Sequence, residues 1–198
     1  VLNGDIYAAL TLSRAYELTQ DPRFIIKVSA IVDHVESRFG AWRNGWWPYS
    51  ETWEGELAVG VSLAYQATIV AFGMPIARVL DFQRAEKWRS LLRRAHETVA
   101  WHLPLGPSDE FEAPAWSRDW ANIWEIPLAF SRLPMQEDSR EFLRQRFDRV
   151  ECDLRAFGID ALRPPILQNP RRTPVTSLYR KSATFAGILS DICLSPMT

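Results

Sequence analysis

The sequence predicts an all-α fold built from helical hairpins, with about seven helices in a single domain that spans residues 1–198. Apolar residues recur at helical spacing through long segments, and Gly and Pro residues gather between these segments. Nearly apolar helices also alternate with charged ones, as they do when one helix of a pair is enclosed and the other faces water. A chain of 198 residues with 47% hydrophobic content can bury one substantial core.

The first two helices are predicted at about 5–18 and 22–38. Apolar residues of the first segment share one broad face, from Ile6 to Tyr16. Asp21 and Pro22 separate the two helices, because Asp favours the N-cap and Pro favours the first helical position, where its missing N–H is not needed. The two segments therefore predict a helical hairpin with a short turn.

A tryptophan-rich segment follows at residues 40–55, with the sequence GAWRNGWWPYSETWEG. Its Gly and Pro residues exclude a regular helix and a central strand. Four indoles are also more apolar surface than a solvated loop needs. We therefore expect an ordered loop between two long helices, either folded over a core or lining a pocket.

The remaining helices are predicted from the same pattern of apolar periodicity interrupted by Gly and Pro residues. A third helix is predicted at 56–72, where the low charge indicates that other helices enclose it. A short piece at 75–80 leads into an amphipathic outer helix at 82–101, and a long loop at 103–116 precedes a fifth helix at 117–133. Beyond these we expect a sixth helix at 137–157, a proline-rich loop at 158–176 and a last helix at 177–193.

This order of elements places the long loops together. Along the chain, an apolar helix, a turn, an amphipathic helix and a long loop follow one another in this order three times, and the order then begins a fourth time. Because successive helices of such hairpins alternate in direction, all three long loops should lie at one end, above the N-termini of the apolar helices. We call this end the long-loop rim.

The segment YAALTLSRAYELTQDPRFIIKVSAIVDHV, with tryptophan-rich loops before the apolar helices, resembles a hairpin of the (α/α) toroids. This group includes the six-hairpin glycosidases, the amino-sugar epimerases and several polysaccharide lyases, and the resemblance extends over residues 5–157. Seven helices make about half of a toroid, so the ring is incomplete, a second copy or partner completes it, or the array stays open and curved. The resemblance implies that substrate enters at the long-loop rim.

Carboxylates of the rim are the catalytic candidates. Glycoside hydrolysis uses two carboxyl groups about 5 to 9.5 Å apart, one of them an acid with a raised pKa. Glu54 could meet Asp109 or Asp119 across neighbouring loops, although for each a solvated position or a helix first turn is the alternative. The paired Asp-Asp of one glycosidase branch is absent from the sequence. The other rim carboxylates are Glu51, Glu56, Glu110 and Glu112.

Aromatic side chains of the rim are the candidate substrate contacts, since flat rings stack on sugar faces or enclose apolar ring systems. The candidates are Trp46, Trp47, Tyr49, Trp53, Trp116 and Trp120. Core packing is the alternative for each tryptophan. Arg118 could bind a carboxylate through two hydrogen bonds or stack on the adjacent indole.

Several classes of partner are disfavoured. A net charge of −1 lacks the basic excess of a nucleic-acid surface. No apolar run approaches the roughly 20 residues that cross a bilayer, and the sequence shows no signal-peptide pattern at its start, which favours a cytoplasmic protein. His34, His96 and His102 lack metal-site spacing, no nucleotide-binding motif occurs, and the two cysteines, Cys152 and Cys193, read as small core residues. We expect no metal and no cofactor.

The leading hypothesis is a carbohydrate-processing enzyme, of hydrolase, lyase or epimerase type, with a tryptophan-lined site for a small-molecule substrate. One alternative is a metal-free cyclase or isomerase whose aromatic pocket folds an apolar, terpenoid-like substrate. The other is a non-enzymatic helical-repeat module that holds a peptide or a partner subunit on its concave surface.

Overall fold

The computed structural model describes residues 2–103 and 125–133, together with positions 141, 144, 145, 148, 151, 152, 155, 156 and 186. The chain divides into two compact units, Val1–Ala113 and Pro114–Thr198, and each is described by itself. The described residues are mostly helical, which confirms the all-α character. The single domain, the count of seven helices and the toroid arrangement stay predictions.

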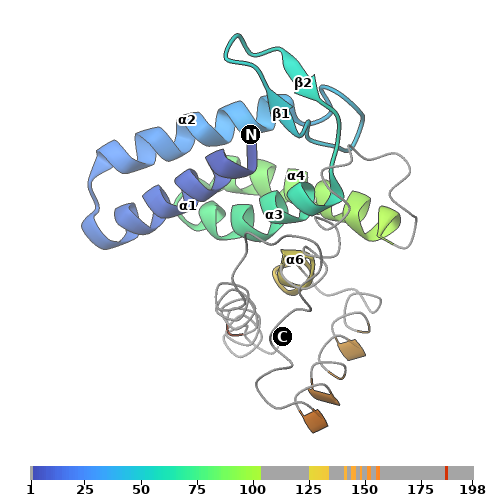
Figure 1. The fold of residues 1–198 in the computed structure, drawn as a ribbon. Coiled ribbons are helices and arrows are strands. Elements are labelled where there is room, and N and C mark those ends of the chain that lie inside the picture. The colour runs from blue at the N-terminus through green and yellow to red at the C-terminus, as the bar shows by residue number, and fades with distance from the viewer. Residues whose placement is uncertain are drawn as a thin grey trace. The chain divides into compact units, whose positions relative to one another are not determined.

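Helices α1 (Leu2–Thr19) and α2 (Pro22–Arg38) form the first helical hairpin (Figure 1). The predicted boundary between them is confirmed, because the Asp21 carboxylate accepts a 2.9 Å hydrogen bond from the Arg23 N–H and Pro22 takes the first helical position. Gln20 completes the turn with a φ of 56°, in the left-handed region. This turn joins the two helices without a loop.

Two short strands lie where the sequence predicted the start of the third helix. Strands β1 (Ser50–Glu51) and β2 (Leu57–Val59) pair antiparallel, and α3 begins only at Leu63 and ends at Gly73. The expected helical start at residue 56 was therefore wrong. Gly60 would cost a helix about 1 kcal/mol relative to alanine, while the Thr52 N–H bonds the Glu56 carbonyl at 2.8 Å and closes a tight turn. The hairpin leads directly into α3.

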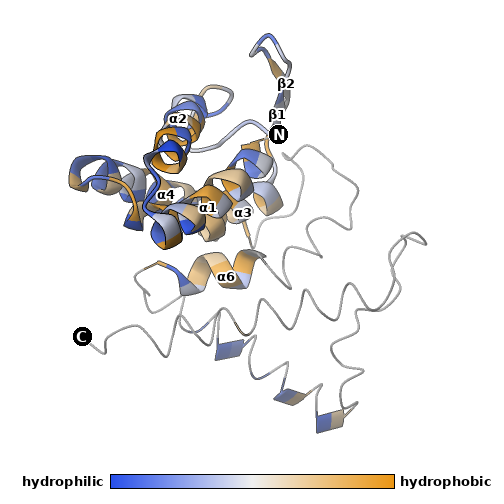
Figure 2. Cartoon of the chain, turned by 90° about the vertical axis from the view of Figure 1, so that its left-hand side faces the viewer, coloured by the Kyte–Doolittle hydropathy of each residue, from blue (hydrophilic) through white to orange (hydrophobic). Residues whose placement is uncertain are grey.

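Helix α3 is enclosed, as its low charge predicted, since buried residues lie on every side of it from Leu63 to Gly73. A 3-10 turn, η1 (Met74–Arg78), and the N-cap Asp81 then start α4 (Phe82–His102). Trp88, Leu92 and other apolar residues of α4 are buried while most of its charged residues stay outside. Figure 2 shows this mixture of hydrophilic and hydrophobic residues on α2 and α4.

Helices α2 and α4 run in the same direction. Arg84 of α4 contacts Asp33 and the Ser29 carbonyl of α2, and further along both helices Lys87 pairs with Glu36. Since each helix is antiparallel to its hairpin partner, α1 and α3 are also parallel, and these two pack together through rings such as Tyr7 and Phe72, 4.8 Å apart. The C-termini of α2 and α4 and the N-terminus of α3 thus share one end (Figure 1).

The second unit contains α6 (Glu125–Ser131), in which Ile126, Leu128, Ala129 and Phe130 are buried. The described positions from 141 to 156 are all helical, which agrees with the helix predicted at 137–157, and position 186 is helical too. Cys152 is exposed, so its prediction as a core residue was wrong. The predicted loop at 103–116, apart from its first residue, and the predicted loop at 158–176 lie outside the described residues.

Candidate functional site

The tryptophan-rich segment, residues 40–55, lies between α2 and α3 at the shared end of the first unit (Figure 1). Its two central indoles point inward, with Trp46 1% and Trp47 2% exposed. The Trp47 Nε1–H donates a 2.8 Å hydrogen bond to the Val35 carbonyl in α2. Its ring meets Phe39 edge-on at 4.7 Å and lies 6.3 Å from the Trp88 ring of α4. These two predicted substrate contacts therefore occupy the core, which was their stated alternative.

A single buried amide fixes this segment to two helices. Gln66 of α3 is 2% exposed, and its side-chain carbonyl accepts a 3.1 Å hydrogen bond from the Trp47 N–H. Its amide nitrogen donates to the Gly45 carbonyl at 2.9 Å and to the Ala95 carbonyl of α4 at 3.1 Å. A buried side chain with its polar atoms satisfied holds a unique geometry, so Gln66 sets the path of the segment.

Trp46 links the same segment to the last turn of α4. Its ring stacks edge-on against the His102 ring at 4.9 Å, and the Arg43 guanidinium lies 5.9 Å from its centroid. The Gly40 N–H donates a 2.8 Å hydrogen bond to the Trp46 carbonyl. The last turn of α4 therefore touches the tryptophan-rich segment, while the common rim of the three long loops stays a prediction.

The hairpin β1–β2 rests on α2 through a polar cluster of three side chains. Glu51 of β1 lies 2.6 Å from His34 Nε2 through one carboxylate oxygen and 2.8 Å from Arg38 Nε through the other. The Glu51 and Arg38 atoms of the second contact are buried, and their angle makes it an ion pair rather than a hydrogen bond. Because the Glu51 side chain is only 14% exposed, this contact is less screened than a surface pair.

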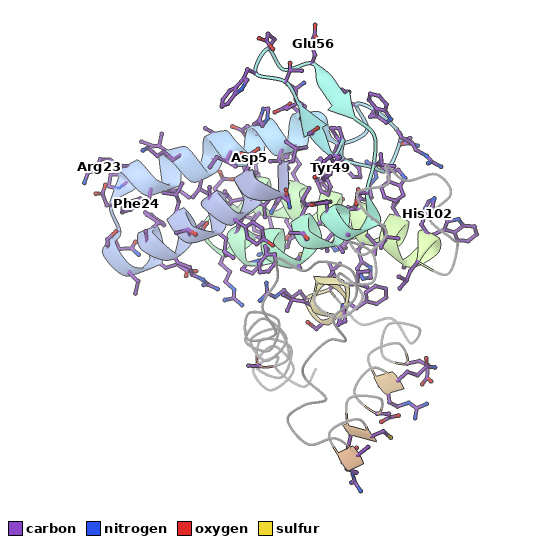
Figure 3. All side chains as sticks on the ribbon, in the orientation of Figure 1. Asp5, Arg23, Phe24, Tyr49, Glu56 and His102 are labelled. Atoms are coloured by element: carbon purple, nitrogen blue, oxygen red, sulfur yellow. The ribbon has the colours of Figure 1, made fainter. Side chains whose placement is uncertain are left out.

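Tyr49 anchors the base of the hairpin. Its hydroxyl lies 3.4 Å from the Tyr65 hydroxyl of α3, and the two rings are 4.5 Å apart in an edge-on arrangement. The Tyr49 N–H also donates a 2.6 Å hydrogen bond to the Gly60 carbonyl. Figure 3 shows Tyr49 at the base of the hairpin, Glu56 at its tip and His102 at the far end of α4.

Other aromatic residues at this end face solvent. Trp53, in the hairpin turn, is fully exposed, Trp42 is 52% exposed, and Trp101 in the last turn of α4 is 73% exposed. Glu54 follows Trp53 in the chain and is also exposed. Of the predicted indoles within the described residues, Trp46 and Trp47 thus point inward and Trp53 faces solvent.

The rest of the predicted site cannot be placed in this way. The predicted site residues Asp109, Asp119, Trp116, Trp120 and Arg118 lie outside the described residues.

The sequence analysis did not propose His34 and Arg38 as site residues. They lie four residues apart on one face of α2, a spacing that could have flagged them as a pair facing Glu51. Gln66 also carried a signal, as the lone amide within an apolar helix.

Burial also changes the charge behaviour of one histidine. It lowers the pKa of His96, in α4, to about 4, so the imidazole is neutral near pH 7.

Among the described residues no three His, Cys, Asp or Glu side chains gather in a group that could hold a metal ion. No helix in the described part of the chain is long and apolar enough to cross a membrane.

No protein-family model, curated protein or solved structure matches this chain. The resemblance to the (α/α) toroids therefore rests on the amino-acid sequence alone, on the first helical hairpin and on the alternation of apolar and charged helices.

Proposed function

We propose that this protein is a carbohydrate-processing enzyme whose ligand binds at the end of the first unit that carries the tryptophan-rich segment. One observation carries the proposal. Exposed indoles project from a segment whose backbone is fixed by buried neighbours, with Trp42 and Trp53 on either side of the anchored Trp46 and Trp47. Indole faces stack on the apolar faces of sugar rings, and a rigid frame lowers the entropy lost on binding.

The hairpin that carries Trp53 also carries a group suited to acid–base chemistry, Glu51, two residues before Trp53. Glu51 and His34 contact each other at 2.6 Å, and Arg38 supplies a positive charge next to them. Carboxylate and imidazole groups are the usual general acids and bases of enzymes. Hydrolysis, elimination and epimerisation of sugars all use such groups. Glu54, Asp109 and Asp119 stay proposals as further carboxylates of the same site.

A non-enzymatic binding module is the second candidate. Trp53 is fully exposed at the tip of a hairpin, a position from which a large ring can enter a pocket of a partner protein. The cyclase alternative has less support, because burial of Trp46 and Trp47 removes two rings from the aromatic wall that it requires. The three hypotheses differ in the ligand that should reach the exposed indoles.

Tryptophan fluorescence titration tests the proposal. We expect quenching by a neutral or charged oligosaccharide, such as chitohexaose, cellohexaose or hexagalacturonate, and a weaker response in Trp53→Ala and Trp42→Ala. Phe82→Ala is the matched control, since Phe82 is an 80% exposed aromatic residue at the opposite end of α4. Its response should equal that of the wild type. Quenching by farnesol alone would favour the cyclase, and no response to any of these ligands would contradict the sugar site.

A further inference from the structure

We propose that His34 is the proton-transfer group of this site, that Glu51 holds it in one tautomer, and that its target is an O–H group of a polyhydroxylated ligand. The proposal rests on the sugar site for the identity of its ligand. The arrangement of His34 and Glu51 is an independent observation and can be tested without any ligand.

The tautomer follows from the contact between the two side chains. Oε1 of Glu51 lies 2.6 Å from Nε2 of His34. A glutamate is ionised near neutral pH, and an ionised carboxylate only accepts hydrogen bonds. The Nε2 atom must therefore carry the proton, and a neutral His34 has its lone pair on Nδ1. Within residues 2–103, Glu51 is the one side chain that bonds this imidazole.

Glu51 orients His34 in the way that a carboxylate orients a histidine acting as a general base. Glu51 is 14% exposed and its second oxygen lies 2.8 Å from Arg38, so the carboxylate is held from two sides. The His34 side chain is 39% exposed, so a ligand can reach the ring. A buried carboxylate that fixes a histidine tautomer and stabilises the imidazolium is the arrangement that makes histidine an effective base.

The chemical step is a proton transfer. The O–H bond of a ligand hydroxyl or of a bound water breaks as an N–H bond forms at Nδ1 of His34. The imidazolium that results lies against the Glu51 carboxylate, so the net charge of the pair changes from −1 to zero. No oxidant or other reactant is needed. The competing account is a permanent ion pair, in which His34 is already charged and only holds the hairpin on α2.

Nitrogen NMR of the histidines separates these accounts on the full chain without ligand. At about pH 7.5, where an ordinary histidine is neutral, we expect His34 as the Nε2–H tautomer. His102 is the internal reference, because its Nδ1 lies 2.9 Å from the Thr98 carbonyl and must donate, which makes it the Nδ1–H tautomer. Glu51→Gln should weaken the preference of His34, since an amide both donates and accepts. A charged or Nδ1–H His34 in the wild type would overturn the proposal.

A second measurement uses the oligosaccharide that quenches fluorescence most strongly. His34→Gln should bind it with unchanged affinity and convert it at least about 100-fold more slowly, the size of effect expected when a general base is lost. Asp33→Asn, which changes the adjacent position on α2, should retain turnover, and circular dichroism should show folded protein for both variants. Unchanged turnover in His34→Gln would overturn the role of His34 while leaving the sugar site intact. If no sugar responds, the proposed function fails, and the NMR result still decides the tautomer.

Discussion

The backbone N–H of Trp47 donates a 3.1 Å hydrogen bond to the side-chain carbonyl of Gln66, nineteen residues later in the chain. This bond joins the centre of a long loop to the middle of the most enclosed helix. Through its amide nitrogen, the same side chain also reaches Gly45 and Ala95. One amide therefore determines which part of the tryptophan-rich segment turns inward and which part faces solvent.

Gln66→Leu should destabilise the first unit by about 2 kcal/mol or more. The substitution keeps the volume but leaves the buried Trp47 N–H unpaired and removes the bonds to the Gly45 and Ala95 carbonyls, of which Ala95 keeps its place in the helix; an unpaired buried group costs about 1 to 3 kcal/mol. Urea unfolding followed by circular dichroism measures the change. Gln83→Leu is the matched control, because Gln83 is exposed on α4, and its effect should stay within about 0.5 kcal/mol. A Gln66→Leu effect as small as this would contradict the anchoring role.

Trp47→Ala and Trp53→Ala should have very different effects, although both residues belong to one segment. Trp47 is 2% exposed and bonds the Val35 carbonyl, so we expect its loss to cost about 3 to 5 kcal/mol. Trp53 is fully exposed, so truncating it should leave stability within about 0.5 kcal/mol. Thermal and urea denaturation of the two variants compare them directly. Equal losses would show that the inward and outward indoles have been misassigned.

Gly45→Ala should cost more stability than Gly40→Ala. Both glycines have φ near +80°, so alanine pays a similar backbone penalty of about 1 to 2 kcal/mol at each. At Gly40 the added methyl group would meet open space, whereas at Gly45 it would lie 2.9 Å from the Thr98 hydroxyl in α4. The double variant Gly45→Ala with Thr98→Ala should recover part of the difference. Additive losses in this double-mutant cycle would argue against the clash.

Acid should destabilise the wild type more than a His96→Gln variant. Burial lowers the pKa of His96 to about 4 in the folded chain, below its unfolded value of 6.5. The unfolded chain therefore binds the proton first, and the stability that comes from a neutral His96 is complete above about pH 6.5 and is lost as the pH falls toward 4. The loss attributable to His96 should reach about 3 kcal/mol. Urea midpoints between pH 7 and pH 4 measure it, with His102→Gln as the comparison, and parallel curves for wild type and His96→Gln would refute it.

The start of α2 could be predicted from sequence because its cause is local. Asp21 and Pro22 act on the backbone within two residues of themselves. The enclosure of α3 was also predictable, since a helix without charges has no face for water. The strands at Ser50–Glu51 and Leu57–Val59 were not, because strands this short have no periodicity to detect.

The candidate site was harder to predict than the helices. The four indoles of the tryptophan-rich segment are equivalent in composition, and only their partners distinguish them. Trp47 turns inward because Gln66 and the Val35 carbonyl hold it, while Trp53 is fully exposed in the hairpin turn. Glu51 approaches His34 only because the whole hairpin folds onto α2. The two residues are 17 positions apart, so local sequence patterns do not reveal the contact.

The two halves of the tryptophan-rich segment are attached by forces of different kinds. Strand β1 of the hairpin is held on α2 by the ion pair of Glu51 with Arg38 and by the contact of Glu51 with His34, whereas Trp46 and Trp47 are held by apolar contact and neutral hydrogen bonds. Salt screens the first kind, although Glu51 is only 14% exposed and is screened less than a surface residue. About 1 M salt, at which the Debye length is about 3 Å, should therefore speed amide exchange in the hairpin more than around the indole anchor.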